Sequence, residues 1–558
     1  METKHTTRKP VDSRRAHGQR YKILALSVAA ALGFAGSFAL IMAGCGGGGT
    51  QPAPPVIPSV TPLSAADVDS IVQAAVNSVN VDMVVAVVDR AGIVLGVFHT
   101  AKTPTMAQGN FGKMTSADDV AVALARTGAF FSNDQAPLSS RTVRFISGVH
   151  FPPGIFNQSN ADLYGIENTN RGCTLVSNNA SYNALVPPST ALGGGPGAGI
   201  LTGKADIFDS DPNAVNPGGV PVFSQATAST QPVVVGGVGV VTTVNTNLNV
   251  AEFAAFSGSA AKLGNGQGSF GLKSVPSPGA VFVGGIALPF VDQTSLPAGF
   301  SAGPVAGPAG SYRTGFGPKA SLGQPPENNL IPPAAGPVGG LTVAEVTQIL
   351  DNAEAEANLT RAAIRLPPGA RTRMVIAVAD LDGTLLGLRR MPDATVFSID
   401  VAASKARNMI YFNSSVRTAA DLNGVPIGTA VTNRTISFGA QPFFPPGIDG
   451  SDPAPQFLTP GPFFNLYTND TSHPCSQGFQ APGANQSGIV FFPGSAGLYK
   501  NGVLVGGLGV SGDGVDQDDF VTAGGTKGFE APDAIRADQV FVRSIRLPYM
   551  KFPRNPTN

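Results

Sequence analysis

The sequence predicts an α+β protein made of two tandem domains, each a mainly antiparallel sheet with packed helices. The first observation is that six segments recur in the same order in both halves of the 558-residue chain. The second is that short β-branched apolar runs alternate with segments of helical periodicity in each half. Together they predict a tandem duplication with copies at residues 63–292 and 341–552, called here the first half and the second half.

Each half opens with a predicted helix and a hairpin. Leu341–Ala357 carries apolar residues at helical spacing, and Thr342 precedes Glu345 by three residues, which is a capping-box pattern. Ser64 and Asp67 repeat this pattern in the first half. Two apolar runs that end in Asp, one of them followed by Leu-Asp-Gly, favour hairpins. Their first strands are expected at Met83–Val88 and Met374–Ala379.

Further helices and strands are expected after each hairpin. Asp119–Phe131 and Asp400–Phe412 have the pattern of a second helix, and a long insertion follows each of them. Val503–Val510 is a predicted strand whose Gly-Gly indicates a close backbone approach. Another helix is expected from Asp516. Residues 293–340 are rich in Gly, Pro, Ser and Ala and are predicted to be a linker.

The N-terminal segment is predicted to export and anchor the protein. Basic residues at positions 4–22 precede the uncharged apolar run Ile23–Ala43, and Cys45 follows Gly44. This order predicts a lipoprotein signal peptide at 1–44, Cys45 as the lipid-modified residue and a flexible tether at 45–62. The alternative is an uncleaved membrane anchor, because about 20 apolar residues can span a bilayer. In both cases the rest of the chain is expected outside the cytoplasm, held to the bacterial cell envelope on the periplasmic face or the cell surface.

The charge balance and the absence of metal-binding motifs argue against two classes of function. Lys plus Arg is 36 and Asp plus Glu is 36, so no basic surface favours nucleic acid as a partner. The chain has no Cys-x-x-Cys or His-Glu-x-x-His motif, so no metal site is predicted. The acidic stretch Ser511–Asp519 lacks the terminal Glu of a calcium loop, and it is interpreted as the acidic first turn of a helix.

Two cysteines, Cys173 and Cys475, remain after Cys45. Cysteines commonly pair in an oxidising compartment. The two are predicted either to form one disulfide that joins the halves or to remain separate thiols.

The motifs of the second half resemble the GlcG/HbpS-like haem-binding family, also described as haem-degrading. Met374–Leu388, Ser398–Arg407 and Gly502–Asp519 carry the resemblance. It implies a profilin-like domain in each half, an intrachain pseudo-dimer and self-association, with haem or a related planar cofactor as the ligand. Leu124 of the first half stands where the second has Lys405, so equally active halves are not expected.

Five residues are candidates for ligand binding. Lys405 and Arg407 lie on a predicted helix, where one of them pairs with a haem propionate or another carboxylate, or both lie on a solvated face. Arg126 is the counterpart of Arg407, in a shared role or in a structural salt bridge. His150, beside a Phe-Pro-Pro-Gly turn that recurs in both halves, and His473 are either axial haem ligands or exposed loop residues.

Three functions remain open at this point. The first is an exported, lipid-anchored binding protein for haem or a related planar ligand. The second is a haem-degrading or small-molecule enzyme that uses Lys405 or Arg407. No nucleophile–base pair or metal cluster is recognised, so no catalytic residue is assigned. The third is a structural envelope protein whose Pro/Gly/Asn-rich insertions contact partners.

Overall fold

The computed structural model of the protein describes residues 62–148, 163–173, 192, 199–204, 216–225, 231–263, 281–303, 310–442, 444 and 459–553. The predicted signal peptide, Cys45, His150 and the prolines of both Phe-Pro-Pro-Gly turns lie outside the described residues. Within the described residues, no helix has the length and apolar character needed to cross a membrane.

A five-stranded antiparallel sheet of order β5-β6-β1-β2-β9 forms the centre of the first half. The helices and strands that build this part are α1 (Ala65–Ser78), β1 (Met83–Asp89), β2 (Val94–Thr100), α2 (Ala117–Phe131), α3 (Ser140–Ser147), β5 (Gly219–Ser224), β6 (Val233–Thr242), α5 (Asn249–Ser259) and β9 (Gly310–Tyr312). Two small hairpins and two single helical turns complete it: β3 (Met106–Gln108) with β4 (Met114–Ser116), β7 (Phe282–Val283) with β8 (Ile286–Ala287), η1 (Asn110–Gly112) and η2 (Ile166–Asn168).

The second half repeats this topology. Its antiparallel sheet runs β13-β14-β11-β12-β10, so its strands take the same relative places as those of the first sheet. Its elements are β10 (Asn328–Ile331), α6 (Val343–Ala357), β11 (Val375–Ala379), β12 (Leu385–Arg390), α7 (Phe397–Asn413), α8 (Asn433–Ala440), α9 (Phe464–Ser472), β13 (Ser495–Lys500), β14 (Val503–Ser511), α10 (Val515–Gly525), η5 (Asp533–Ile535), η6 (Ala537–Gln539), β15 (Phe541–Val542) and β16 (Ile545–Arg546). The prediction of an α+β protein with antiparallel sheets and packed helices is confirmed. That the first half also resembles the GlcG/HbpS-like family stays a prediction.

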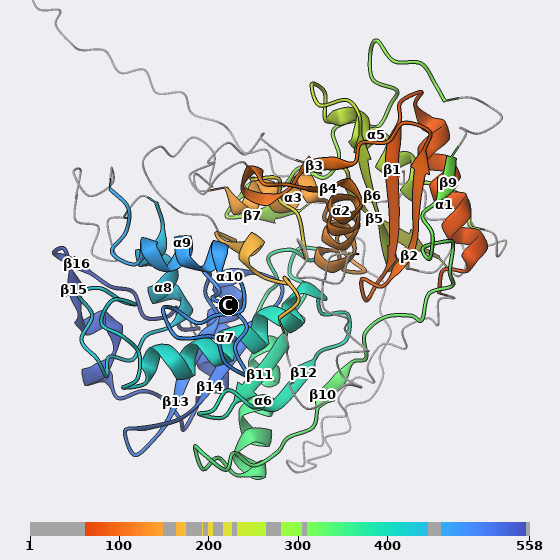
Figure 1. Cartoon of the computed structure of the whole chain (residues 1–558). Helices are drawn as coiled ribbons and strands as arrows, with labels where there is room; N and C mark the ends of the chain where they lie inside the picture. The colour runs from red at the N-terminus through yellow and green to blue at the C-terminus, as the bar shows by residue number, and fades with distance from the viewer. Residues whose placement is uncertain are drawn as a thin grey trace, which may run out of the picture. The chain divides into compact units, whose positions relative to one another are not determined.

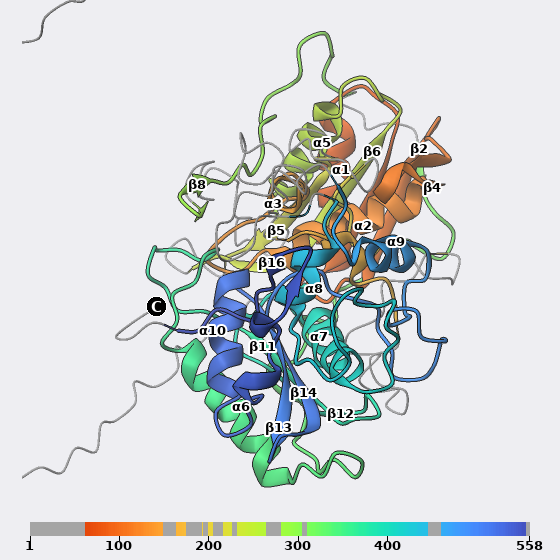
Figure 2. The ribbon, with the colours of Figure 1, turned by 90° about the vertical axis from the view of Figure 1, so that its left-hand side faces the viewer.

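Helices cover both faces of each sheet. Successive side chains of a strand point to opposite faces, and β1 shows this: Val84 and Val88 pack with α2, whereas Met83 and Val87 pack with α1 and α5. Figure 1 shows β1 between α2 and α1. Figure 2 shows the second sheet with α6 and α10 on one side and α7 on the other. Each half is therefore a sheet with a single long helix on one face and a helix pair on the other.

The segments that carry these local sequence patterns adopt the predicted structures. Ser64 and Thr342 are N-caps, whose side chains accept hydrogen bonds from the backbone N–H of Asp67 and Glu345. The two carboxylates accept the N-cap N–H groups in return. The hairpins β1–β2 and β11–β12 are antiparallel pairs, as the turn chemistry predicts.

The segment between the halves does more than connect them. β9 pairs with β2 at the edge of the first sheet, and β10 pairs with β12 at the edge of the second. Residues 293–340, predicted to be a linker, therefore supply the fifth strand of each sheet. Average composition identifies the turns of such a segment, but it does not detect two extended runs of three or four residues between them.

Side chains of the two halves are joined covalently and by an ion pair. Cys173 and Cys475 form a disulfide, which confirms the predicted pairing. Close to it, Arg171 contacts Asp470 of α9 at 2.7 Å between nitrogen and oxygen. Side chains of α2 and α7 also belong to one hydrophobic cluster. The two halves therefore pack against each other around a shared core.

Candidate functional site

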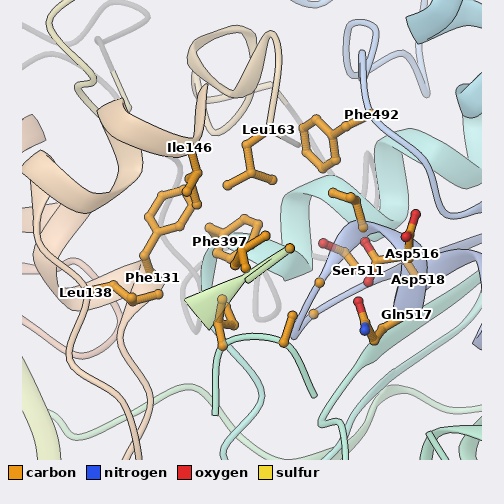
Figure 3. Close-up of a pocket in the computed structure, with 17 residues that line it drawn as sticks. Phe131, Leu138, Ile146, Leu163, Phe397, Phe492, Ser511, Asp516, Gln517 and Asp518 are labelled. Carbon is orange, nitrogen blue, oxygen red and sulfur yellow. The ribbon is translucent and has the colours of Figure 1, made fainter. Parts of the chain in front are cut away.

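A pocket of about 180 Å³ lies where α2 of the first half meets α7 and α10 of the second (Figure 3). The rings of Phe131 and Phe397 stack there with centroids 4.1 Å apart. Each ring belongs to a different half, so neither half forms this wall by itself. The other apolar residues of the lining are Leu138, Ile146, Leu163, Val283, Ala363, Ile364, Phe492 and Val515.

The facing wall is polar and is formed where β14 runs into α10. Ser511 ends β14, and Gln517 and Asp518 lie in the first turn of α10. Figure 3 shows these side chains on the side of the pocket away from Phe131. The turn between the two elements needs Gly514, whose φ is +140° and where a Cβ would lie 2.2 Å from the Gln517 side chain.

Asp518 forms a buried ion pair with Lys405 of α7. The Lys405 Nζ donates to Asp518 Oδ2 at 2.9 Å and to the Val510 carbonyl at 2.7 Å, and it lies 4.8 Å from the centroid of the Phe492 ring. The two side chains are 0% and 3% exposed. Because burial disfavours charge, it lowers the pKa of Lys405 and raises the pKa of Asp518 to about 7. Asp518 Oδ1 accepts no hydrogen bond from the described residues.

Two glycines mark equivalent places in the halves. Gly218 precedes β5, and Gly494 precedes β13. Their carbonyls accept hydrogen bonds from Val240 of β6 and Val510 of β14, at 2.9 and 2.8 Å. These valines stand at the same position of the Val-Gly-Gly motif in each half. The surroundings of the two glycines can therefore be compared directly.

The first half has apolar side chains where the second has the ion pair. A Cβ built on the glycine before β5 would meet Leu124 and Ala251, each at 3.4 Å. A Cβ built on the glycine before β13 would meet the Lys405 Nζ at 2.7 Å and the Asp518 Cβ at 2.5 Å. Leu124 and Ala251 thus occupy the places of Lys405 and Asp518.

Arg126 and Arg407 hold hairpin turns and do not line this pocket. The Nε of each arginine donates to a turn carbonyl at 2.9 Å, Arg126 to Gly92 and Arg407 to Gly383. Burial lowers the pKa of Arg126 to about 10. The feature that the two halves share at this position is therefore a structural contact between a helix and a hairpin.

Residues 341–526 match the family model described as "Haem degrading protein HbpS-like". The chain contains an HbpS-like domain. It is also similar to two crystal structures, a PduOC:heme complex and the Klebsiella pneumoniae protein ORFY. Each of these structures is 19% identical to this chain and covers 34% of it. The match covers 96% of the PduOC chain with a TM-score of 0.22, and 88% of the ORFY chain with a TM-score of 0.21. No curated protein matches the chain.

The HbpS-like domain contains both members of the buried ion pair, whereas the predicted histidines lie elsewhere. His473 is the exposed C-cap residue of α9, and its Nδ1 lies 3.1 Å from the Asn469 carbonyl oxygen. His150 is outside the described residues. The described part of the chain has no group of three or more His, Cys, Asp or Glu side chains placed to hold a metal ion.

The described lining of the pocket does not fit a haem bound through its iron. It contains no His, Cys, Met or Tyr, the usual axial ligands. Its volume of about 180 Å³ is also below the roughly 300–1,000 Å³ of sites for drug-sized ligands. A cavity of about 150 Å³ lined by Leu, Ile and Phe binds benzene in another protein. The pocket therefore fits one aromatic ring with a polar group attached.

Sequence reasoning assigned no binding role to Asp518 or to the phenylalanines. Asp518 does lie in the first turn of α10, as predicted, but it is buried against Lys405 rather than solvated. Lys405 is not on a solvated helix face either, since its exposed fraction is 0%. The two residues are 113 positions apart, so no local spacing pairs them. The sequence feature that could have pointed to Lys405 is that Leu124 stands at its position in the first half.

Proposed function

We propose that the protein is an exported, lipid-anchored binding protein whose pocket in Figure 3 holds a small, flat, mostly apolar ligand. Export and anchoring through Cys45 rest on the signal pattern of residues 1–44. The ligand class rests on the pocket. Because both halves contribute to its wall, the first half has a role in binding even without its own Lys405.

The observation that carries the proposal is the set of phenylalanine rings around one ring-sized space. Phe131 and Phe397 supply a stacked pair, and Phe492 supplies a third ring on the lining. Aromatic side chains favour stacked or edge-on contact with another ring. Transfer of an apolar ligand ring from water to this wall is favourable by about 25 cal/mol for each Å² buried.

Haem, which the family description names, is the second candidate ligand. The described pocket is small for a macrocycle and offers no axial ligand. His150, which lies outside the described residues, stays the candidate axial ligand. We therefore rank haem below a one-ring aromatic compound as the expected ligand. Because the family description names haem, it is the first compound to test beside the one-ring ligand.

Calorimetric titration of the purified protein with toluene and, separately, absorbance titration with haemin test the proposal. We expect toluene to bind at one site per chain. Ala363→Phe should abolish this binding, because Ala363 lines the pocket and an added ring fills it. Ala362→Phe is the matched control, since the neighbouring Ala362 is also half-buried but lies outside the lining. A stoichiometric Soret shift with haemin but no binding of toluene would favour haem instead, and no binding of haemin or of any one-ring aromatic compound would remove the proposed function.

A small-molecule enzyme is the second candidate function, favoured by one observation. Asp518, with a pKa of about 7 and a lysine beside it, has the properties of an acid–base group in a pocket. Consumption of a bound ligand that is lost in Asp518→Asn while the ligand still binds would support this reading. A ligand recovered unchanged after prolonged incubation would leave binding alone.

A further inference from the structure

The fold does not need the buried ion pair of the second half. Replacing a buried pair with well-packed apolar residues is often neutral or stabilising. The first half has this apolar arrangement, since Leu124 and Ala251 stand in place of Lys405 and Asp518. Packing therefore does not explain why the second half places two charges here.

The pair lies at the pocket, and one of its oxygens has no partner. Asp518 lines the pocket and is 2% exposed. Its Oδ2 is held by Lys405, whereas its Oδ1 has no hydrogen-bond partner among the described residues. A buried acceptor without a donor is costly and rare in native proteins. A donor on a bound ligand would satisfy this oxygen.

The charge around Asp518 favours a neutral donor over a cation. Lys405 already neutralises Asp518, and the nearby Asp516 contacts Arg434 at 2.8 Å and Lys551 at 2.6 Å. A cationic ligand would therefore leave an uncompensated positive charge in a buried place, which is costly. The Phe492 ring, which could attract a cation, already lies next to the Lys405 ammonium. A hydroxyl group donates a hydrogen bond and adds no charge.

We infer that the Lys405–Asp518 pair is a recognition element that selects one-ring aromatic ligands carrying a hydroxyl group, such as phenols and aromatic alcohols. The inference rests on the proposed function of the pocket. Lys405 holds the carboxylate in place, Asp518 Oδ1 accepts the ligand hydroxyl, and the phenylalanine wall takes the ring. The second half then carries the ion pair because the ligand hydroxyl forms a hydrogen bond with Asp518.

The test compares p-cresol with toluene, which differ by one hydroxyl group, on the purified full-length protein. At pH 8, where Asp518 with its pKa of about 7 is mostly ionised, we expect p-cresol to bind at least about tenfold more tightly, because the toluene complex lacks the hydrogen bond to the charged carboxylate. Benzylamine, a cation at neutral pH, should bind more weakly than p-cresol. The double variant Lys405→Leu/Asp518→Ala copies the first half, and it should bind toluene at least as well as the wild type while losing the preference for p-cresol.

Each outcome decides a different point. Equal affinity for p-cresol and toluene in the wild type would overturn the inference and leave the proposed function standing. No binding of any aromatic compound would overturn the proposed function itself. Benzylamine binding more tightly than p-cresol would overturn the choice of a neutral donor. Because these comparisons use the wild-type protein, they decide the question even if the double variant fails to fold.

Discussion

The two halves share one sheet order but differ at one buried position. The first half fills it with Leu124 and Ala251, and the second half with the ion pair of Lys405 and Asp518. The first half shows that this architecture packs with apolar residues there. The charged pair of the second half is therefore better explained by the pocket that Asp518 lines than by stability.

A different ion pair is present at matching places in both halves. Arg141 of α3 contacts Glu252 of α5 at 2.7 Å, and Arg434 of α8 contacts Asp519 of α10 at 2.5 Å. These elements occupy matching places in the two halves. An ion pair that recurs in both halves indicates a structural role, whereas the pair found beside the pocket in one half indicates a role in function.

The largest loss of stability is expected for Lys405→Leu alone. This change leaves Asp518 buried without its cation, and breaking a buried pair in this way costs about 3–5 kcal/mol. Urea unfolding measures the loss. Leu124→Met, at the same helix position of the first half, is the matched control and should cost less than about 1.5 kcal/mol. A Lys405→Leu variant as stable as the wild type would contradict the pairing.

Removing the disulfide should give the next largest effect. Cys173 and Cys475 are 302 positions apart, so Cys173→Ser/Cys475→Ser releases a long loop in the unfolded chain and should cost roughly 2–5 kcal/mol. Thermal unfolding with and without reductant checks this. Reductant should lower the melting temperature of the wild type and leave that of the serine variant unchanged. If reductant has no effect on the wild type, the two halves do not depend on this link.

The stability that Asp89 contributes should fall as pH rises. Asp89 is 0% exposed, and burial raises its pKa to about 6. Between pH 4 and 6 the folded protein keeps a proton that the unfolded chain has released, so stability falls with rising pH in this window. Asp89→Asn removes this dependence. Its free energy of unfolding, measured relative to the wild type, should rise by up to about 3 kcal/mol from pH 4 to pH 7. A difference that stays constant with pH would contradict the shifted pKa.

The two turn-holding arginines should both contribute to stability. Arg126→Met and Arg407→Met each remove a charged donor from a hairpin carbonyl, and each should cost roughly 1.5–3 kcal/mol by urea unfolding, with the larger loss for Arg407, which also donates to the Ser487 hydroxyl. Neither should change the affinity for p-cresol, because neither residue lines the pocket. If Arg407→Met alone weakens binding, the sequence-based prediction that Arg407 binds the ligand would be restored.

Much of the fold was predictable because its signals are local. Capping boxes at Ser64 and Thr342 and the hairpin turns all act over a few residues, and each formed as predicted. The disulfide could be anticipated because Cys173 and Cys475 remained to pair after Cys45.

The site was less predictable because it depends on long-range contacts. Phe131 meets Phe397 and Lys405 meets Asp518 through the packing of separate elements, and neither meeting follows from spacing along the chain. β9 and β10 were missed for a related reason, since short edge strands become strands only when a sheet is present to pair with them.

The free energy of unfolding of Lys405→Leu/Asp518→Ala tests the central claim most directly. This variant gives the second half the side chains that the first half already carries at the same place. If the pair serves the ligand and not the fold, the variant should unfold in urea within about 1 kcal/mol of the wild type, despite the large losses in either single variant. A loss above about 3 kcal/mol in the double variant would show that the pair is structural and would contradict the account.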